Sequence, residues 1–265
     1  MPLANNATLP AAGCLDSFQP ESLLPLAFTV TGITTFIICY WMVQHYRLQE
    51  TKFPIVSQLG EKRPAYWVFA MGSTMSSVLL AATVGLQARN MSRCGTEGVQ
   101  PISIASTVIG LIACPALVLT GWVSVAHNHT AHLVFAGIAI SCLITHCFMS
   151  AINSQFAGVG IGFVVSRIAF SGMASMACGW GMYSVVRASQ VATQKRSILE
   201  KIESDASPSK SADAQIGARA DNVQRIQEAF NARIRFHAAM GAIFQWCGFA
   251  CIMVALSLTA GSNLL

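Results

Sequence analysis

Long apolar stretches separated by shorter polar segments dominate this chain. Each is about twenty residues or more, the length an α-helix needs to cross a hydrocarbon core of about 30 Å. They cover residues 23–46, 66–88, 101–125, 132–152, 161–187 and 237–260. The pattern predicts an all-α membrane protein, a bundle of six transmembrane helices.

Such a bundle uses the whole chain, so we expect residues 1–265 to form a single transmembrane domain. Composition agrees with a membrane location. Only 10% of the residues are charged, and the mean hydropathy is +0.55. A soluble domain carries about a quarter charged residues.

The one sizeable polar segment, residues 188–236, lies between the fifth and sixth apolar stretches. Apolar residues recur in it at helical spacing on both sides of a Ser-Pro-Ser break at 207–209, which predicts two helical extensions. These residues are Val191, Ile198 and Ile202 before the break, and Ile216, Val223, Ile226, Phe230 and Ile234 after it. We therefore expect a charged helical hairpin that projects beyond the bilayer. The alternative is a partly disordered loop.

The basic residues are placed asymmetrically. Thirteen of the 16 Lys and Arg lie in the connections after the first and fifth helices, and the other three are Arg89, Arg93 and Arg167. The positive-inside rule puts these basic connections in the cytoplasm and both termini on the opposite side. The expected partners are membrane lipids and a protein that docks on residues 187–236. Nucleic acid is not expected, since the basic residues do not cluster on a soluble face.

Two glycosylation sequons begin at Asn6 and Asn90, and both fall on the predicted non-cytoplasmic side. Cys14 and Cys94 fall on the same side, where a disulfide is chemically permitted. These four residues are candidates for modification.

No constellation in the sequence points to catalysis. The six apolar stretches contain no Asp or Glu, whereas proton-coupled pumps and intramembrane proteases depend on a carboxylate at membrane depth. We therefore expect no enzyme activity and assign no catalytic, cofactor-binding or metal-binding residue.

Histidines leave one alternative open. His132 and His146 are fourteen residues apart on the fourth helix, nearly on one face and about 21 Å apart by helical rise. Two-haem membrane cytochromes use such a pair, with matching histidines on a second helix. His45 and His237 lie at the same end as His132, which leaves no partner for His146. Interhelical polar contacts are the simpler expectation, for these histidines and for the trio at 127, 129 and 132 that could be read as a zinc site.

The loop after the first helix carries a motif made of Phe53, Pro54, Ser57, Gly60 and Pro64. It resembles the corresponding loop of the FRAG/DRAM/Sfk family of six-helix membrane proteins, which share the CWH-type N-terminal domain.

Two further regions are similar to the same family. His132 lies in an entry to helix four that resembles the family pattern, and Gln245-Trp246 resembles its A-x-x-E-W motif, with Gln in place of Glu. Members of this family are usually drawn with both termini in the cytoplasm, the reverse of what the charge count predicts. We take the orientation from the charge asymmetry because it is a physical insertion bias and the sequons agree with it.

The resemblance implies a role in lipid handling and membrane organisation rather than catalysis. The implied roles are lipid remodelling of GPI anchors, recruitment of a phosphoinositide kinase, or autophagy. We therefore expect a non-enzymatic integral membrane protein of the plasma membrane or of an endomembrane such as the Golgi or lysosome. Alternatives are a GPI-anchor lipid-remodelling factor, a haem-binding redox protein, and a channel or transporter.

Overall fold

The computed structural model describes residues 23–48, 56–93, 100–156, 159–204 and 213–264. Within these ranges the regular structure is entirely helical. The elements are α1 (Leu24–His45), a short 3-10 helix η2 (Val56–Gln58), α2 (Ala65–Arg93), α3 (Gln100–Trp122), α4 (His129–Phe156), α5 (Ile161–Ser204) and α6 (Asp213–Leu264).

The six α-helices confirm the predicted fold class. Each is long and apolar enough to cross a membrane. The ends of the first four α-helices differ from the predicted spans by a few residues, whereas α5 and α6 continue beyond theirs. The chain is thus an integral membrane protein whose helices satisfy their own backbone hydrogen bonds, as the hydrocarbon core demands.

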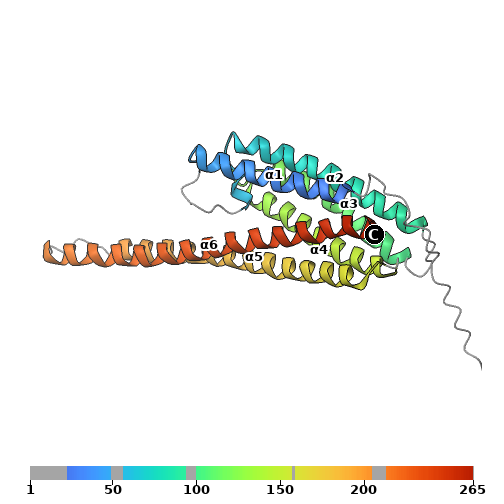
Figure 1. The fold of residues 1–265 in the computed structure, drawn as a ribbon. Helices are drawn as coiled ribbons and strands as arrows, with labels where there is room; N and C mark the ends of the chain where they lie inside the picture. Colours follow the sequence, from blue (N-terminus) through green and yellow to red (C-terminus); the bar gives the residue numbers. More distant parts are fainter. Residues whose placement is uncertain (1–22, 49–55, 94–99, 157–158, 205–212, 265) are drawn as a thin grey trace, which may run out of the picture.

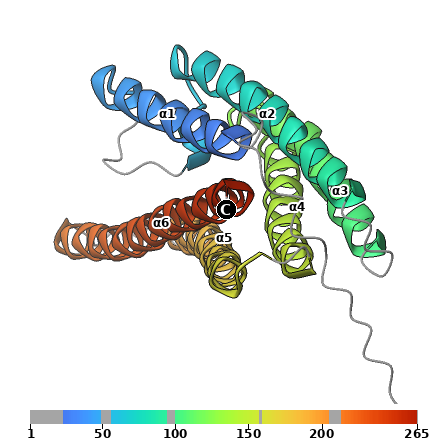
Figure 2. The same cartoon turned by 45° about the vertical axis from the view of Figure 1, so that its right-hand side comes forward.

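The helices pack largely in chain order. Helices α1 to α4 each contact the next, while α5 and α6 pack chiefly against each other. Contacts of α5 with α4 and of α6 with α1 join this pair to the rest of the bundle, as Figures 1 and 2 show. The apolar core between the helices includes Phe28, Leu80, Leu143 and Ile252.

Helices α5 and α6 form one antiparallel pair that runs from the bundle to the hairpin. Each step forward along α5 is matched by an equal step back along α6, so the register is constant. The pairs are Cys178 with Gly248, Gly181 with Gln245, Val185 with Gly241, and Lys195 with Asn231. Small residues hold the pair together inside the bundle, where close backbone approach replaces the hydrophobic effect.

The predicted hairpin is confirmed. Helix α5 has 44 residues and α6 has 52, against 22 for α1, and both extend well beyond the bundle in Figure 1. Outside the bundle the two helices bury larger apolar side chains part-way between them, and Lys195 Nζ donates a 2.8 Å hydrogen bond to Asn231 Oδ1. The half-buried apolar residues are Val191, Ile198, Ile202, Val223, Ile226, Phe230 and Ile234. Ile216 lies in α6, but its side chain is outside the described residues.

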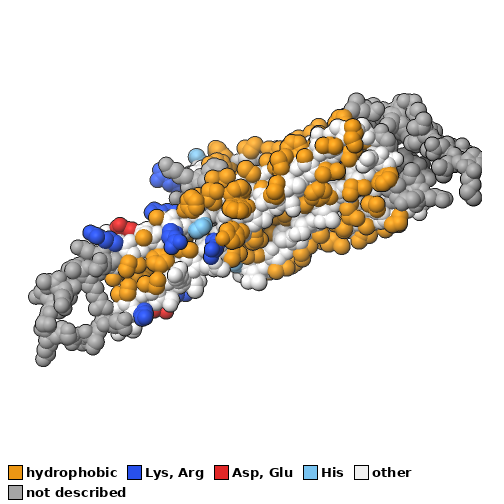
Figure 3. Space-filling model, turned by 90° about the horizontal axis from the view of Figure 1, so that it is seen from below, with side chains coloured by type: hydrophobic (Ala, Val, Ile, Leu, Met, Phe, Trp, Pro, Cys, Tyr) orange, Lys and Arg blue, Asp and Glu red, His pale blue; other side chains and the backbone are white. Residues whose placement is uncertain are grey.

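The outer surface changes character along the bundle. Hydrophobic side chains cover the bundle on the face in Figure 3, and Lys and Arg appear toward the end from which the hairpin projects, here called the hairpin end. All five Trp and all four Tyr lie in the half of their predicted membrane span nearer that end. Trp41, Trp67, Trp122 and Trp180 are exposed there, as expected of side chains at a membrane–water boundary.

Candidate functional site: two polar regions at opposite ends of the bundle

The loop that carries the family-like motif starts from a tight reversal at the end of α1. Arg47 adopts a left-handed backbone conformation, with φ 49°. The N–H of Arg47 donates to the carbonyl of Gln44 (3.3 Å), and the N–H of Leu48 donates to that of Val43 (3.0 Å). This is the Schellman pattern of helix termination. It turns the chain back toward the bundle.

The loop then packs into the bundle instead of lying on its surface. Val56 and Leu59 are buried, and Leu59 belongs to a cluster with Cys39 and Phe69. Gly60 is buried because it lies against Phe69: a Cβ at position 60 would lie 2.6 Å from Cδ1 of that ring. A glycine is therefore required here by close approach.

Not every residue of the motif is described. Phe53 and Pro54 lie outside the described residues, as does the side chain of Ser57, whose backbone belongs to η2. Pro64 follows a cis peptide bond and immediately precedes α2. Its carbonyl accepts a hydrogen bond from the N–H of Trp67, at 3.1 Å.

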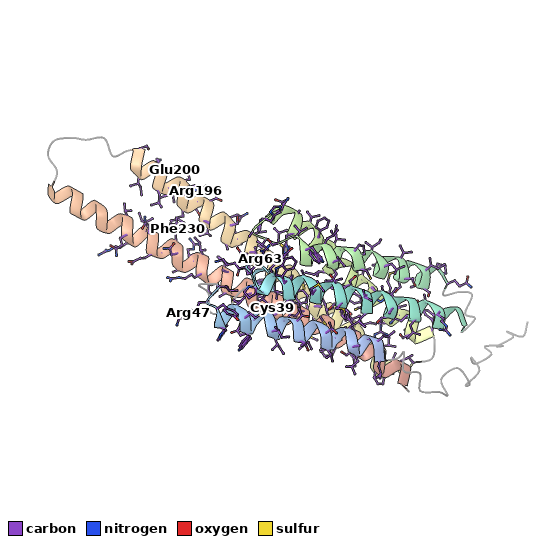
Figure 4. All side chains as sticks on the ribbon, turned by 90° about the horizontal axis from the view of Figure 1, so that it is seen from above. Cys39, Arg47, Arg63, Arg196, Glu200 and Phe230 are labelled. Atoms are coloured by element: carbon purple, nitrogen blue, oxygen red, sulfur yellow. The ribbon has the colours of Figure 1, made fainter. Side chains whose placement is uncertain are left out.

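The motif on α6 meets this loop through an aromatic cluster. The ring of Trp246 lies edge-on to Phe36 (centroids 5.8 Å apart) and to Tyr40 (6.5 Å). Phe36 in turn lies 6.2 Å from Phe69, the ring that covers Gly60. The structure thus joins two motif positions that are far apart in the sequence, and Figure 4 shows Cys39, Arg47 and Arg63 at the same end.

His132 and Gln245 also serve packing. His132 is buried at the start of α4, where its Nδ1 donates a 2.7 Å hydrogen bond to the carbonyl of Val123 just after α3. Gln245 lies against α5, with its Cγ 3.2 Å from where a Cβ on Gly181 would be. The described motif residues therefore tie helices together at the hairpin end.

The arrangement of the histidines does not favour haem. His146 is buried on α4, and its Nδ1 lies 3.1 Å from Ser106 Oγ and 2.9 Å from the Ser106 carbonyl. A Cβ on Gly110 would already lie 2.9 Å from that nitrogen, so the ring is tightly enclosed. Within the described ranges no cluster of three or more His, Cys, Asp or Glu side chains could hold a metal ion.

The modification candidates are only partly visible. Asn6, Cys14 and Cys94 lie outside the described residues, and Asn90 lies in the last turns of α2 with its side chain not described. Their use for glycosylation or for a disulfide stays a prediction.

The sequence analysis missed the most unusual polar group of the bundle, Arg167. This side chain on α5 is 1% exposed. One guanidinium nitrogen donates to Ser150 Oγ at 2.6 Å, and another donates to Ser154 Oγ at 2.7 Å. Its Nε atom has no hydrogen-bond partner. A buried cation held only by neutral groups is rare, because an unpaired buried charge costs several kcal/mol.

Further unpaired polar atoms lie on the helix turns next to Arg167 and to Ser150. Among the described residues, five buried side-chain nitrogen or oxygen atoms lack a hydrogen bond. One of the five is His132 Nε2, at the hairpin end. The other four are His146 Nε2, Asn153 Oδ1, Arg167 Nε and Ser171 Oγ. His146 and Asn153 lie one turn on either side of Ser150 on α4, and Ser171 lies one turn after Arg167 on α5. We call this group, with Ser150 and Ser154, the Arg167 cluster.

The Arg167 cluster lies at the end opposite the hairpin. Arg167 is six residues after the start of α5, which places it about 9 Å along the helix by its rise. A long basic side chain at this depth usually extends outward to the interface. Here it points into the bundle instead. The only sign of this site in the sequence was a lone arginine in an apolar stretch.

A family comparison covers most of the chain. The model described as the Frag1/DRAM/Sfk1/Cwh43P N-terminal domain matches residues 20–261, nearly the whole chain. The chain belongs to this family. Comparison with curated proteins and with solved structures gives no match. The family suspected from the sequence is thus confirmed for this Frag1/DRAM/Sfk1/Cwh43P member.

Proposed function

We propose that this protein is a non-enzymatic regulator of membrane lipid organisation or trafficking. The bundle serves as a scaffold in contact with lipid, and the α5–α6 hairpin serves as a docking surface for a protein partner. Family membership supports the membrane role. The lipid-related roles, including autophagy and GPI-anchor handling, come from what the family resemblance implies.

The hairpin is the observation that carries this proposal. A pair of helices that only needed to cross the membrane would end near residues 187 and 237, yet both continue well beyond the other four helices (Figure 1). Their shared apolar seam is half-buried, while charged side chains such as Arg196, Glu200 and Glu228 are exposed. The hairpin is therefore rigid enough to present a fixed polar surface.

A second candidate function is lipid remodelling of GPI anchors. The Arg167 cluster favours it, because a buried cation in the half of the bundle remote from the hairpin suits a lipid substrate presented from that side. On the orientation predicted from charge, that side is the lumen or exterior.

Gene deletion with rescue tests the first function. We expect deletion to alter the lipid composition or protein traffic of the membrane where the tagged protein resides, and the wild-type chain to restore it. An Arg196→Glu, Lys201→Glu variant should insert normally but fail to restore, because both residues are exposed on the hairpin. A matched reversal at exposed Arg89, on the opposite end, should restore.

Unchanged lipids and traffic after deletion would contradict the proposal. A specific change in the lipid moiety of GPI-anchored proteins, with other lipids unaffected, would favour the second candidate instead.

A further inference from the structure

The Arg167 cluster combines a charge with no counter-charge and a set of unsatisfied polar atoms. All eleven Asp and Glu of the chain lie outside the six predicted membrane spans. Among the described residues, the hydrogen bonds of Arg167 go only to Ser150 and Ser154. Serine hydroxyls satisfy N–H groups, but they do not neutralise a cation.

Packing alone does not explain why this charge is retained. Replacing a buried ionic group by an apolar residue of similar volume is often neutral or stabilising. Water could satisfy the unpaired atoms of His146, Asn153 and Ser171, but it would leave the charge uncompensated. An anion meets both needs of Arg167: it neutralises the guanidinium charge, and it accepts a hydrogen bond from the unpaired Nε–H.

The geometry selects the kind of anion. A guanidinium presents a planar fork of N–H groups that matches the oxygens of phosphate. On the neighbouring helix turns, Ser171 Oγ can donate, and Asn153 can donate after an amide flip. His146 Nε2 is an acceptor, because Nδ1 of that ring donates to the Ser106 carbonyl. Several donors around one cation suit an oxyanion with several oxygens.

The position of the cluster suggests how such an anion reaches it. At about 9 Å inside the end of α5, Arg167 lies close to the depth at which phospholipid headgroups meet the hydrocarbon. The connection before α5 is rich in glycine, and side chains at Gly160 or Gly162 would meet nothing within 4 Å. The start of α5 is therefore not closely covered beside these two glycines.

We propose that the Arg167 cluster is a binding site for a phosphate group, contributed by the headgroup of a membrane lipid or by free phosphate. Arg167 supplies the charge, Ser150 and Ser154 hold its side chain in place, and Asn153 and Ser171 supply the remaining contacts. The site deepens the proposed lipid-related function by naming the group that is recognised.

Thermal unfolding of the full-length protein, purified in phospholipid-free detergent, tests the site. The melting temperature is measured with each of three additives: phosphatidic acid, diacylglycerol with the same acyl chains, and inorganic phosphate. We expect a phosphate-bearing additive to raise the melting temperature of the wild-type chain and diacylglycerol not to, because a ligand stabilises the state that binds it. Response to phosphatidic acid alone assigns a lipid phosphate, and response to inorganic phosphate assigns a soluble one.

Substitutions tie the effect to the cluster. Arg167→Gln should raise the half-maximal concentration of the stabilising additive by about tenfold or more, because a charge-assisted hydrogen bond is lost. Arg89→Gln is the matched control, because Arg89 is exposed near the same end, and it should respond as the wild type does. If Arg167→Gln does not fold, Ser154→Ala keeps the cation and should still raise the half-maximal additive concentration several-fold.

Three results would contradict the proposed site. The melting temperature of the wild type could respond to neither phosphate-bearing additive, or it could respond equally to diacylglycerol. The third is a half-maximal additive concentration that stays unchanged in the Arg167 and Ser154 variants. None of these would affect the docking role of the hairpin, which is tested with Arg196 and Lys201.

Discussion

The two ends of the bundle treat their polar groups in opposite ways. At the hairpin end, aromatic and basic side chains face outward, and the interior is filled by the rings of Phe36, Phe69 and Trp246. At the opposite end, the cation of Arg167 and its unpaired neighbours face inward. Outward charges are solvated and need no further explanation, whereas an inward charge without a counter-ion indicates a ligand.

The two ends also differ in what their notable residues do: some hold the fold together, and one is a candidate for binding. The described family-like residues at the hairpin end fill space and close turns, so they explain how the fold is held. Arg167 belongs to none of the motifs quoted, and it is the group whose burial stability alone does not explain. We therefore expect substitutions at the two ends to fail differently: by unfolding at the hairpin end, and by loss of ligand at the other.

The largest effect is expected for Gly60→Val. The added side chain would overlap the ring of Phe69, and overpacking as close as this costs about 3 kcal/mol or more. Gly85→Val is the control, because a Cβ at Gly85 would meet nothing within 4 Å. Thermal unfolding of the two purified variants checks this. Equal melting temperatures would mean that the loop does not pack on α2 as described.

A smaller loss is expected for Trp246→Ala. It removes the ring that connects α6 to Phe36 and Tyr40 on α1, at a cost of about 2 kcal/mol because the ring is only partly buried. Trp180→Ala removes a 55% exposed ring and should cost less than about 1 kcal/mol. The same unfolding assay compares them, and a larger loss at Trp180 would refute the aromatic cluster as the link between the two helices.

The hairpin seam should be weaker still. Phe230→Ser removes a half-buried ring from the seam between α5 and α6, which should destabilise the hairpin locally by about 1–2 kcal/mol. Hydrogen exchange in the full-length protein should rise in residues 188–204 and 223–234, with the bundle unaffected. Phe236→Ser, at a 61% exposed position on the same helix, should leave exchange in residues 188–204 unchanged. Exchange that is equal in both variants would reduce the hairpin to a solvated linker.

The smallest effect concerns anionic lipid near the hairpin. Residues 187–236 contain nine Lys or Arg and six Asp or Glu, so an attraction of about 1 kcal/mol per basic residue near the surface is largely cancelled. Cleavage of the hairpin by trypsin should be only slightly slower in anionic than in neutral nanodiscs. Moderate salt should abolish the difference. Strong protection that persists in salt would indicate a specific lipid contact instead.

The sequence predicted what depends on composition and period. The six spans, the hairpin with its seam from Val191 to Ile234, and the family all followed from apolar length, helical spacing and short motifs. The contact of Gly60 with Phe69, and through Phe36 with Trp246, could not be predicted, because neither spacing nor propensity specifies which faces of distant helices meet. Arg167 was counted only as a basic residue near one end, since a sequence does not show whether a long side chain turns outward or inward.

Orientation in the membrane decides whether the two ends have the roles proposed for them. Protease treatment of sealed microsomes that hold the full-length protein measures it directly, with the hairpin as the sensitive segment. We expect cleavage within residues 187–236 without opening the vesicles, together with a glycosidase-sensitive mass that an Asn6→Gln, Asn90→Gln variant lacks. A hairpin that is cleaved only after the membrane is opened would contradict this orientation. It would place the docking surface outside the cytoplasm and the Arg167 cluster in the cytoplasmic leaflet.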